Sequence, residues 1–238
     1  SELEHVVVKG LHCHIGSQIL EKAPFVHAAE VMLQFFAQVR EELGTTFEHL
    51  NLGGGFGIHY TERDDAIPYE EYMEDVSAMV HAKCRELGLD LPYIFIEPGR
   101  SIVGEAGITL YTVGNIKHIP GVRDYVAIDG GMFDNPRYAL YQSSYTCILA
   151  NKAGKPADYT ATIAGKCCES GDLIQEHTLI QKPEEGDILA VLSTGAYNYS
   201  MASNYNRNLK PAVVMVSRGK SRIVVKGETY EDLVRNDV

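Results

Sequence analysis

The chain has 238 residues, a formal net charge of −11 and 45% hydrophobic residues. The chain is acidic and has no basic stripe. This argues against nucleic-acid binding, which needs Lys and Arg to replace phosphate counterions. No apolar run approaches the roughly 18 residues of a membrane span, and no signal-peptide pattern is visible at the start. Five cysteines without metal-ligand spacing predict free thiols in a reducing cytoplasm and no metal site.

The first hundred residues alternate strand and helix patterns. A β-branched run at Val6–Val8 predicts a strand that leads to His14, and Pro24 opens a helix that Gly44 closes. Eight apolar residues at helical spacing are expected to face the core: Phe25, Ala28, Ala29, Met32, Phe35, Phe36, Val39 and Leu43.

Two further strands and a second helix complete this pattern. Leu50–Leu52 is predicted as a buried strand, Tyr69–Leu87 as an amphipathic helix that Gly88 closes, and Tyr93–Ile96 as a third strand. Strand-like runs then follow with little helix between them: Thr109–Ile116, Tyr125–Ile128, Tyr159–Ala164, Ile188–Leu192, Ala212–Val216 and Arg222–Val225.

The predicted fold class is therefore α/β followed by β. Residues 1–112 are expected to form part of a (β/α) barrel, since a full barrel needs eight units and roughly 250 residues. Residues 113–238 are expected to form a mostly antiparallel β-barrel or sandwich domain, with the boundary near residues 105–118.

Three short signatures stand at the ends of the predicted strands, about one β/α unit apart. They are His14-Ile15-Gly16-Ser17, Gly53-Gly54-Gly55 and Glu97-Pro98-Gly99-Arg100. Polar groups at successive strand ends are typical of an active site on a (β/α) barrel.

Each signature also has a purely structural interpretation. The glycine run exposes backbone N–H groups that can cradle a phosphate, but such runs also make tight turns. Glu97 can keep a pyridine nitrogen protonated and Arg100 can bind phosphate or carboxylate, but the two can equally form a structural ion pair. His14 can stack on an aromatic ring or serve as a core residue.

The second half carries three polar clusters in expected loops. Cys167–Asp172 places a thiol beside acidic groups, which favours proton donation over nucleophilic attack, although a plain surface loop fits the same residues. Asp134–Tyr141 and Gly195–Tyr199 bring Arg and Tyr together, and buried pairs of this kind receive carboxylates. Ordinary strand aromatics are the alternative.

Taken jointly, these motifs resemble the fold-type III pyridoxal-phosphate-dependent decarboxylases, which have an alanine racemase-like barrel. Among them the sequence is most similar to the members that convert meso-diaminopimelate to L-lysine. The motifs occur in the family's order along the whole chain: Gly10–Gln18, Leu52–Gly57, Glu97–Arg100, Asn135–Tyr141, Cys168–Asp172 and Gly195–Tyr197.

The resemblance implies a role for each matching residue. His14 would stack on the cofactor ring, Glu97 would pair with its pyridine nitrogen, and Tyr197 would lie near both its phosphate and the substrate. The phosphate would be held by Ser17, Gly53, Gly54, Gly55, Gly99 and Arg100. Substrate carboxylate would be received by Arg100, Arg137 and Tyr141.

The resemblance also implies a homodimer with shared active sites. Cys168 and Glu169 would reach the site of the other subunit, where Cys168 would return a proton after carbon dioxide leaves and Glu169 would recognise the substrate amine. The Arg137–Tyr141 loop and Glu169 favour diaminopimelate. A decarboxylase of ornithine, lysine or carboxynorspermidine is the alternative within the family.

Two departures qualify the resemblance. Tyr138 stands where many members have proline, while Ala139, Leu140 and Tyr141 are retained. The lysine that holds the cofactor covalently in this family has no match in the chain, so the chain is expected to be a C-terminal portion that is inactive by itself. A non-catalytic phosphate-binding module and a polyamine-sensing relative are the other readings, and Cys168 argues against the second.

Overall fold

The computed structural model describes residues 3–238, which form two compact units. The first unit contains the described residues up to His59 together with residues 63–102. The second contains residues 60–62 and 103–238. The division therefore falls at residue 102, somewhat before the expected boundary at 112, because the strand that begins at Thr109 pairs within the second unit.

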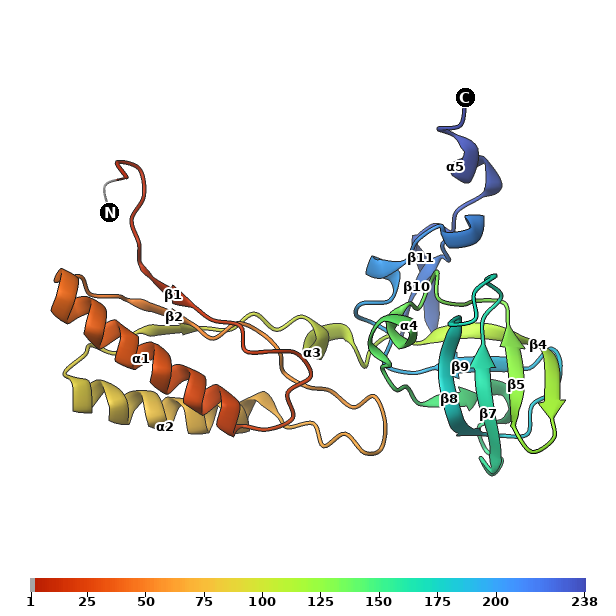
Figure 1. Ribbon diagram of the computed structural model, residues 1–238, viewed down its shortest axis with the longest axis horizontal. Helices are drawn as coiled ribbons and strands as arrows, with labels where there is room; N and C mark the ends of the chain where they lie inside the picture. The colour runs from red at the N-terminus through yellow and green to blue at the C-terminus, as the bar shows by residue number, and fades with distance from the viewer. Residues whose placement is uncertain (1–2) are drawn as a thin grey trace. The chain divides into compact units, whose positions relative to one another are not determined.

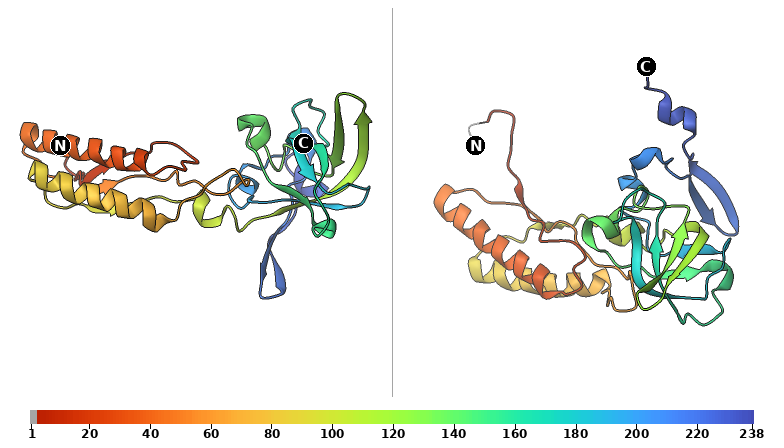
Figure 2. Two further views of the ribbon diagram at one scale, coloured as in Figure 1. Left: turned by 90° about the horizontal axis from the view of Figure 1, so that it is seen from below. Right: turned by 45° about the vertical axis from the view of Figure 1, so that its right-hand side comes forward.

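The first unit is a short parallel sheet with two long helices (Figure 1). Its strands are β1 (Gly10–His12), β2 (His49–Asn51) and β3 (Tyr93–Phe95), in that order across the sheet. Helices α1 (Ala23–Leu43) and α2 (Tyr69–Leu87) connect them, and Figure 2 shows the two helices side by side. Three parallel strands joined by two helices confirm the predicted partial barrel, and within residues 3–238 β1 and β3 each pair on one side only.

The apolar stripe of α1 differs in part from the prediction. Phe25, Ala29, Leu33 and Phe36 are buried, at the four- and three-residue spacing of one helix face. Leu33 was not among the expected residues. Phe35 is 47% exposed because it lies beside this stripe, and Leu43, in the last turn, is 72% exposed.

Helix α2 matches its predicted limits, and its buried face packs into the same core. Tyr72, Val76, Val80 and Cys84 are buried there. Both helices end at a glycine in the left-handed conformation, Gly44 with φ 65° and Gly88 with φ 59°. A glycine C-cap of this kind satisfies the last helical carbonyls without strain from a Cβ.

The valine run Val6–Val8 is not a strand, contrary to the prediction. All three side chains are exposed, and β1 begins only at Gly10. Gly10 pairs with His49, the first residue of β2, so the valines have no strand opposite them. Among residues 3–238, no strand pairs with the three valines.

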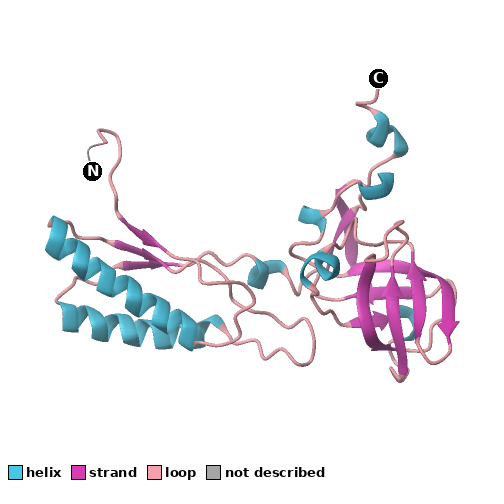
Figure 3. Cartoon of the chain, in the orientation of Figure 1, coloured by secondary structure: helices cyan, strands magenta, loops and turns pink. Residues whose placement is uncertain are grey.

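The second unit is built on a six-stranded, strongly curved sheet (Figure 3). Its order is β6-β9-β4-β5-β7-β8, antiparallel except for the parallel pair β5–β7. This confirms the predicted mostly antiparallel β domain. The strands are β4 (Thr109–Ile119), β5 (Arg123–Ile128), β6 (Cys147–Leu149), β7 (Tyr159–Ala164), β8 (Leu173–Ile180) and β9 (Ile188–Val191).

Glutamine side chains connect the chain segments at and beside β6 and β8, the two end strands of this sheet. The Oε1 atom of Gln175 accepts a hydrogen bond from Tyr145 N at 2.9 Å. Gln181 Oε1 accepts one from Leu149 N at 2.8 Å. The sheet thus approaches a closed barrel in which side chains replace the missing backbone ladder between β6 and β8.

The remaining elements of the second unit are short. Helix α3 (Arg100–Val103) lies at the boundary, with residues 100–102 in the first unit, and α4 (Arg137–Tyr141) lies between β5 and β6. The hairpin β10 (Val213–Ser217) and β11 (Lys220–Val225) projects from the barrel (Figure 2), and α5 (Tyr230–Val234) follows it. Three 3-10 turns are η1 (Ala150–Lys152), η2 (Tyr199–Met201) and η3 (Tyr205–Arg207).

No helix within residues 3–238 combines the length and apolar character needed to cross a membrane.

Candidate active site

The three signatures of the first unit meet at one edge of its sheet. Strands β1, β2 and β3 are parallel and in register, so the residues that follow them emerge together. The Gly54 N–H donates to His14 Nδ1 at 3.3 Å, and Glu97 N donates to the Gly53 carbonyl at 2.7 Å. His14, the glycine run and Glu97 thus form one continuous surface of polar groups.

Glycine is required at this edge because the loops approach one another closely. A Cβ on Gly53 would lie 2.5 Å from the Cys13 carbonyl oxygen, and one on Gly54 would lie 2.4 Å from the Glu97 carbonyl oxygen. Gly53 also has φ 69°, a backbone conformation that side chains disfavour. Close packing thus requires these glycines; the Gly53 N–H donates to Asn51 Oδ1 at 2.9 Å, and of the three glycines only Gly55 is not fully buried.

The Glu97 carboxylate is held in place by two residues that the sequence analysis missed. Asn51 Nδ2 donates to Glu97 Oε1 at 2.8 Å, and His12 Nε2 lies 3.3 Å from Oε2. Both partners lie on strands, so the orientation of the carboxylate is fixed by the sheet.

Ser17 and Arg100 form a second polar pair in this unit. Arg100 Nη2 donates to Ser17 Oγ at 2.6 Å, although the residues are far apart in sequence. Arg100 is buried, and Gly99 precedes it at the turn into α3. The ion pair between Glu97 and Arg100 that was one alternative is thus replaced by separate partners for each.

These residues fit a phosphorylated aromatic ligand such as pyridoxal phosphate. A fixed, half-exposed carboxylate can bind a ring nitrogen, an imidazole can lie against a ring, and a glycine cradle with a nearby hydroxyl and guanidinium can bind a phosphate. The donor set therefore has the chemistry that the resemblance implies.

Arg137 is the centre of a separate cluster in the second unit. Its side chain is 7% exposed, and Nη1 donates to the Tyr145 hydroxyl at 3.0 Å. The guanidinium carbon lies 4.9 Å from the ring centre of Tyr60, 5.8 Å from that of Tyr145 and 6.0 Å from that of Tyr197. Within residues 3–238 no carboxylate forms an ion pair with it.

Burying a cation without an ion-pair partner costs folding free energy, so the surroundings of Arg137 indicate what kind of ligand it suits. Taking a charge out of water costs several kcal/mol unless an opposite charge or good hydrogen bonds compensate, typically more than about 3 kcal/mol for an unpaired group. Three aromatic faces and one hydroxyl compensate Arg137 only in part. Such a guanidinium is well suited to receive a carboxylate in its plane.

Two asparagines add polar groups to the region of Arg137. Both polar atoms of the Asn135 side chain are buried and have no hydrogen-bond partner among the described residues. The same holds for the Nδ2 atom of Asn198. Asn198 Oδ1 accepts from the Tyr145 hydroxyl at 3.4 Å. Tyr197, with φ 63° and 42% exposed, reaches from the cluster to the surface.

Tyr141 and the cysteine loop are placed differently from Arg137. Tyr141 lies on α4, one turn after Arg137, and is 63% exposed. Cys168 and Glu169 are also exposed. The Cys168 N–H donates to Asn206 Oδ1 at 2.8 Å, and Glu169 Oε1 accepts from Gly171 N at 3.3 Å.

Asp172 builds the loop that presents these two residues. Its carboxylate accepts hydrogen bonds from Met132 N at 2.5 Å and from Cys167 N at 2.6 Å. Burial and the neighbouring Asp172 raise the pKa of Cys167 to about 11. Cys167 is therefore a protonated thiol, whereas the neighbouring Cys168 is exposed.

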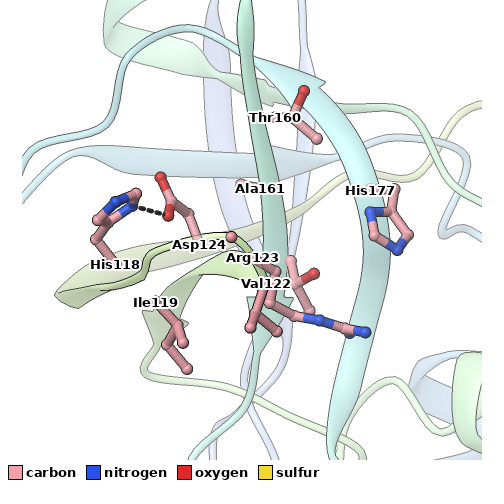
Figure 4. Close-up of a pocket in the computed structure, with 10 residues that line it drawn as sticks. His118, Ile119, Val122, Arg123, Asp124, Thr160, Ala161 and His177 are labelled. Carbon is pink, nitrogen blue, oxygen red and sulfur yellow. Dashed lines mark hydrogen bonds and ion pairs between the residues drawn. The ribbon is translucent and has the colours of Figure 1, made fainter.

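A hollow of about 300 Å³ in the wall of the second unit does not carry this chemistry (Figure 4). Its charged residues already have partners: His118 is paired with Asp124, and Arg123 with Glu176. His177 also lines the hollow, and the other lining residues are small or apolar. In the described part of the chain no group of three His, Cys, Asp or Glu residues could hold a metal ion.

Comparison with known proteins gives this geometry a family context. Residues 1–104 match the family model described as "Pyridoxal-dependent decarboxylase, pyridoxal binding domain". The chain is 53% identical to the diaminopimelate decarboxylase of Bacillus subtilis, covering 99% of the chain and 54% of that protein. It is 49% identical to the one of Staphylococcus aureus, covering 98% and 55%.

Solved structures agree with the sequence relatives. The diaminopimelate decarboxylase of M. jannaschii in complex with L-lysine superposes with a TM-score of 0.91 at 35% identity, over 100% of this chain and 53% of that one. A lysine/ornithine decarboxylase of Vibrio vulnificus shares the fold, with a TM-score of 0.71 at 23% identity. The chain spans about half the length of the curated relatives that it matches.

Proposed function

We propose that this chain, which belongs to the fold-type III family of pyridoxal-phosphate-dependent decarboxylases, is part of an enzyme that decarboxylates meso-diaminopimelate to L-lysine. The observation that carries the choice of substrate is Arg137, a buried guanidinium without an ion-pair partner in the described chain. Diaminopimelate keeps one carboxylate when it loses the other, and Arg137 is suited to receive the one that is kept.

The first unit would hold the cofactor. Its imidazole at His14 would stack on the ring, and the fixed carboxylate of Glu97 would bind the ring nitrogen. Pyridoxal phosphate, when bound, acts as an electron sink for the bond that breaks. The phosphate would be bound by Ser17, Gly53, Gly54, Gly55, Gly99 and Arg100.

The second unit would recognise the substrate. Arg137 would bind the kept carboxylate through the in-plane N–H groups that its aromatic neighbours leave free, and Tyr141, one turn later on α4, would add a hydroxyl. In the first unit, Arg100 is proposed to bind a substrate carboxylate as well. These contacts orient the substrate so that only one of its two carboxylates is in position to leave.

Cys168 and Glu169 are proposed to act in the active site of a second subunit. Both are exposed on a loop that Asp172 rigidifies, as residues that cross a dimer interface would be. The Sγ of Cys168 would deliver a proton to the carbon that has lost its carboxylate. The Glu169 carboxylate would bind the substrate amine. We therefore propose a homodimer, and a cytoplasmic location fits five free cysteines.

Carbon dioxide release by the full-length protein tests the proposal. The protein is supplied with pyridoxal phosphate and with meso-diaminopimelate, L-ornithine, L-lysine or L-arginine in separate assays. A strong preference for meso-diaminopimelate is expected, because it alone offers a carboxylate to Arg137 at the end that is kept. A preference for ornithine, lysine or arginine would contradict the assignment of Arg137 and move the protein among the decarboxylases of simple basic amino acids.

A further inference from the structure

We infer that Tyr60 is a positioning residue that holds the Arg137 guanidinium ready for the kept carboxylate of the substrate. The inference rests on the proposed function of Arg137 and goes beyond it. It assigns a role in substrate selectivity to a residue that lies in none of the catalytic motifs and follows the glycine run by only a few positions.

The contact between the two residues is the shortest of the three ring contacts of Arg137. The guanidinium carbon lies 4.9 Å from the Tyr60 ring centre, against 5.8 Å and 6.0 Å for Tyr145 and Tyr197. Tyr60 is 6% exposed and Arg137 is 7% exposed, so water does not weaken the contact. A desolvated cation–π pair of this kind is stronger than an exposed one.

Tyr60 is itself fixed at both its backbone and its ring. Its carbonyl oxygen accepts two hydrogen bonds from Thr146, one from the backbone N–H at 3.0 Å and one from Oγ1 at 2.9 Å. Its ring meets that of Tyr145 edge to face, with centres 5.3 Å apart and planes at 89°. Residues 60–62 thus belong to the second unit although the chain around them belongs to the first.

This geometry determines which part of the guanidinium stays available. Rings that cover the face of an arginine leave its N–H groups free, because these donors point outward in the guanidinium plane. Tyr145 takes one donor. The others are then held in a fixed plane, which is the arrangement that a bidentate carboxylate contact needs. Loss of the Tyr60 ring would let the guanidinium turn and would raise the cost of binding.

The test compares two inhibitors that differ by one carboxylate. L-lysine retains the carboxylate that Arg137 would bind, and cadaverine lacks it. Inhibition constants for both are measured on the full-length enzyme with Tyr60→Phe, Tyr60→Leu and Tyr60→Met, together with KM and kcat for meso-diaminopimelate. Met fills the space of the ring without a π face, so the test does not depend on a single variant.

Tyr60→Leu and Tyr60→Met are expected to raise the inhibition constant of L-lysine and the KM of diaminopimelate roughly tenfold or more, with a smaller change in kcat. Cadaverine should bind as it does to the wild type, and Tyr60→Phe should behave as the wild type because it keeps the ring. Tyr125→Leu is the matched control, since it removes a ring that lies 5.8 Å from the guanidinium of a different arginine, Arg123.

Unchanged L-lysine inhibition in both ring-deleting variants would overturn the inference. Equal weakening of L-lysine and cadaverine would also overturn it, because a general structural defect does not distinguish the two. A wild-type enzyme that releases no carbon dioxide from diaminopimelate would instead overturn the proposed function, and this assignment with it.

Discussion

The second unit buries two charged residues that are close in sequence, Asp134 and Arg137. Arg137 lies among tyrosine rings, whereas the Asp134 carboxylate accepts a hydrogen bond from the Tyr111 hydroxyl at 2.9 Å. Burial raises the pKa of Asp134 to about 6, although the hydrogen bond from Tyr111 opposes this rise. The two residues are therefore not an ion pair, and Arg137 keeps its charge available for a ligand.

The raised pKa of Asp134 predicts a pH dependence of stability. Between its ordinary pKa of 3.8 and about 6 the folded state holds a proton that the unfolded state has lost, so the contribution of Asp134 to the free energy of unfolding falls as pH rises through this window. Asp134→Asn keeps an oxygen for Tyr111 and removes the titration. Relative to wild type, it should gain about 3 kcal/mol in unfolding free energy between about pH 4 and pH 7. Denaturant unfolding of the full-length protein measures this, and a difference that stays constant with pH would contradict it.

The loop after β2 is the element on which the proposed cofactor site depends. Its glycines fill the space where β1, β2 and β3 end side by side, and the same contacts connect His14, Gly54 and Glu97. A small change in this loop therefore moves several site residues at once.

Gly54→Ala tests that dependence. The new Cβ would lie 2.4 Å from the Glu97 carbonyl oxygen, so β3 or the loop must shift. Overpacking of this kind costs about 1–3 kcal/mol, and we expect the affinity of the full-length protein for pyridoxal phosphate to fall about tenfold or more. Gly154→Ala is the control, because a Cβ there meets nothing within 4 Å. Equal cofactor affinity of the two variants, followed by the cofactor's absorbance, would refute this role of the loop.

Elements with a clear period were predictable from the sequence, and those defined by distant partners were not. The sequence predicted helix α2 with its correct limits, because its apolar stripe and its terminal glycine indicate the same end. Strands β6 and β8 were missed. Strand β8 carries Gln175, Glu176 and His177 in its middle, and His177 has φ 49° where the pairing with β7 is irregular, so no alternation is visible.

The same distinction applies to the site residues. The signatures at the strand ends could be predicted to meet, because parallel strands bring their ends to one edge. The sequence could not reveal that His12 and Asn51 fix Glu97, or that Tyr60 lies against Arg137, since each pairing depends on tertiary contacts between residues far apart in the chain.

At the scale of the whole molecule, each unit has its own polar cluster and its own chemistry. The first carries groups that suit a phosphate and a ring nitrogen, and the second carries a buried cation that suits a carboxylate. Since the chain spans about half the length of its curated relatives, activity is a property to be measured on the full-length protein. Because the two units carry different groups, a substitution in one unit is expected to affect either cofactor binding or substrate binding.

The most direct test compares meso-diaminopimelate with L-lysine as substrates for the full-length wild type and Arg137→Met. L-lysine has a single carboxylate, so when that carboxylate is placed to leave, none remains for Arg137 to bind. The account predicts that Arg137→Met lowers kcat/KM for diaminopimelate roughly 100-fold and leaves the low value for L-lysine nearly unchanged, so that the preference collapses. A preference for diaminopimelate that survives in Arg137→Met would contradict the account.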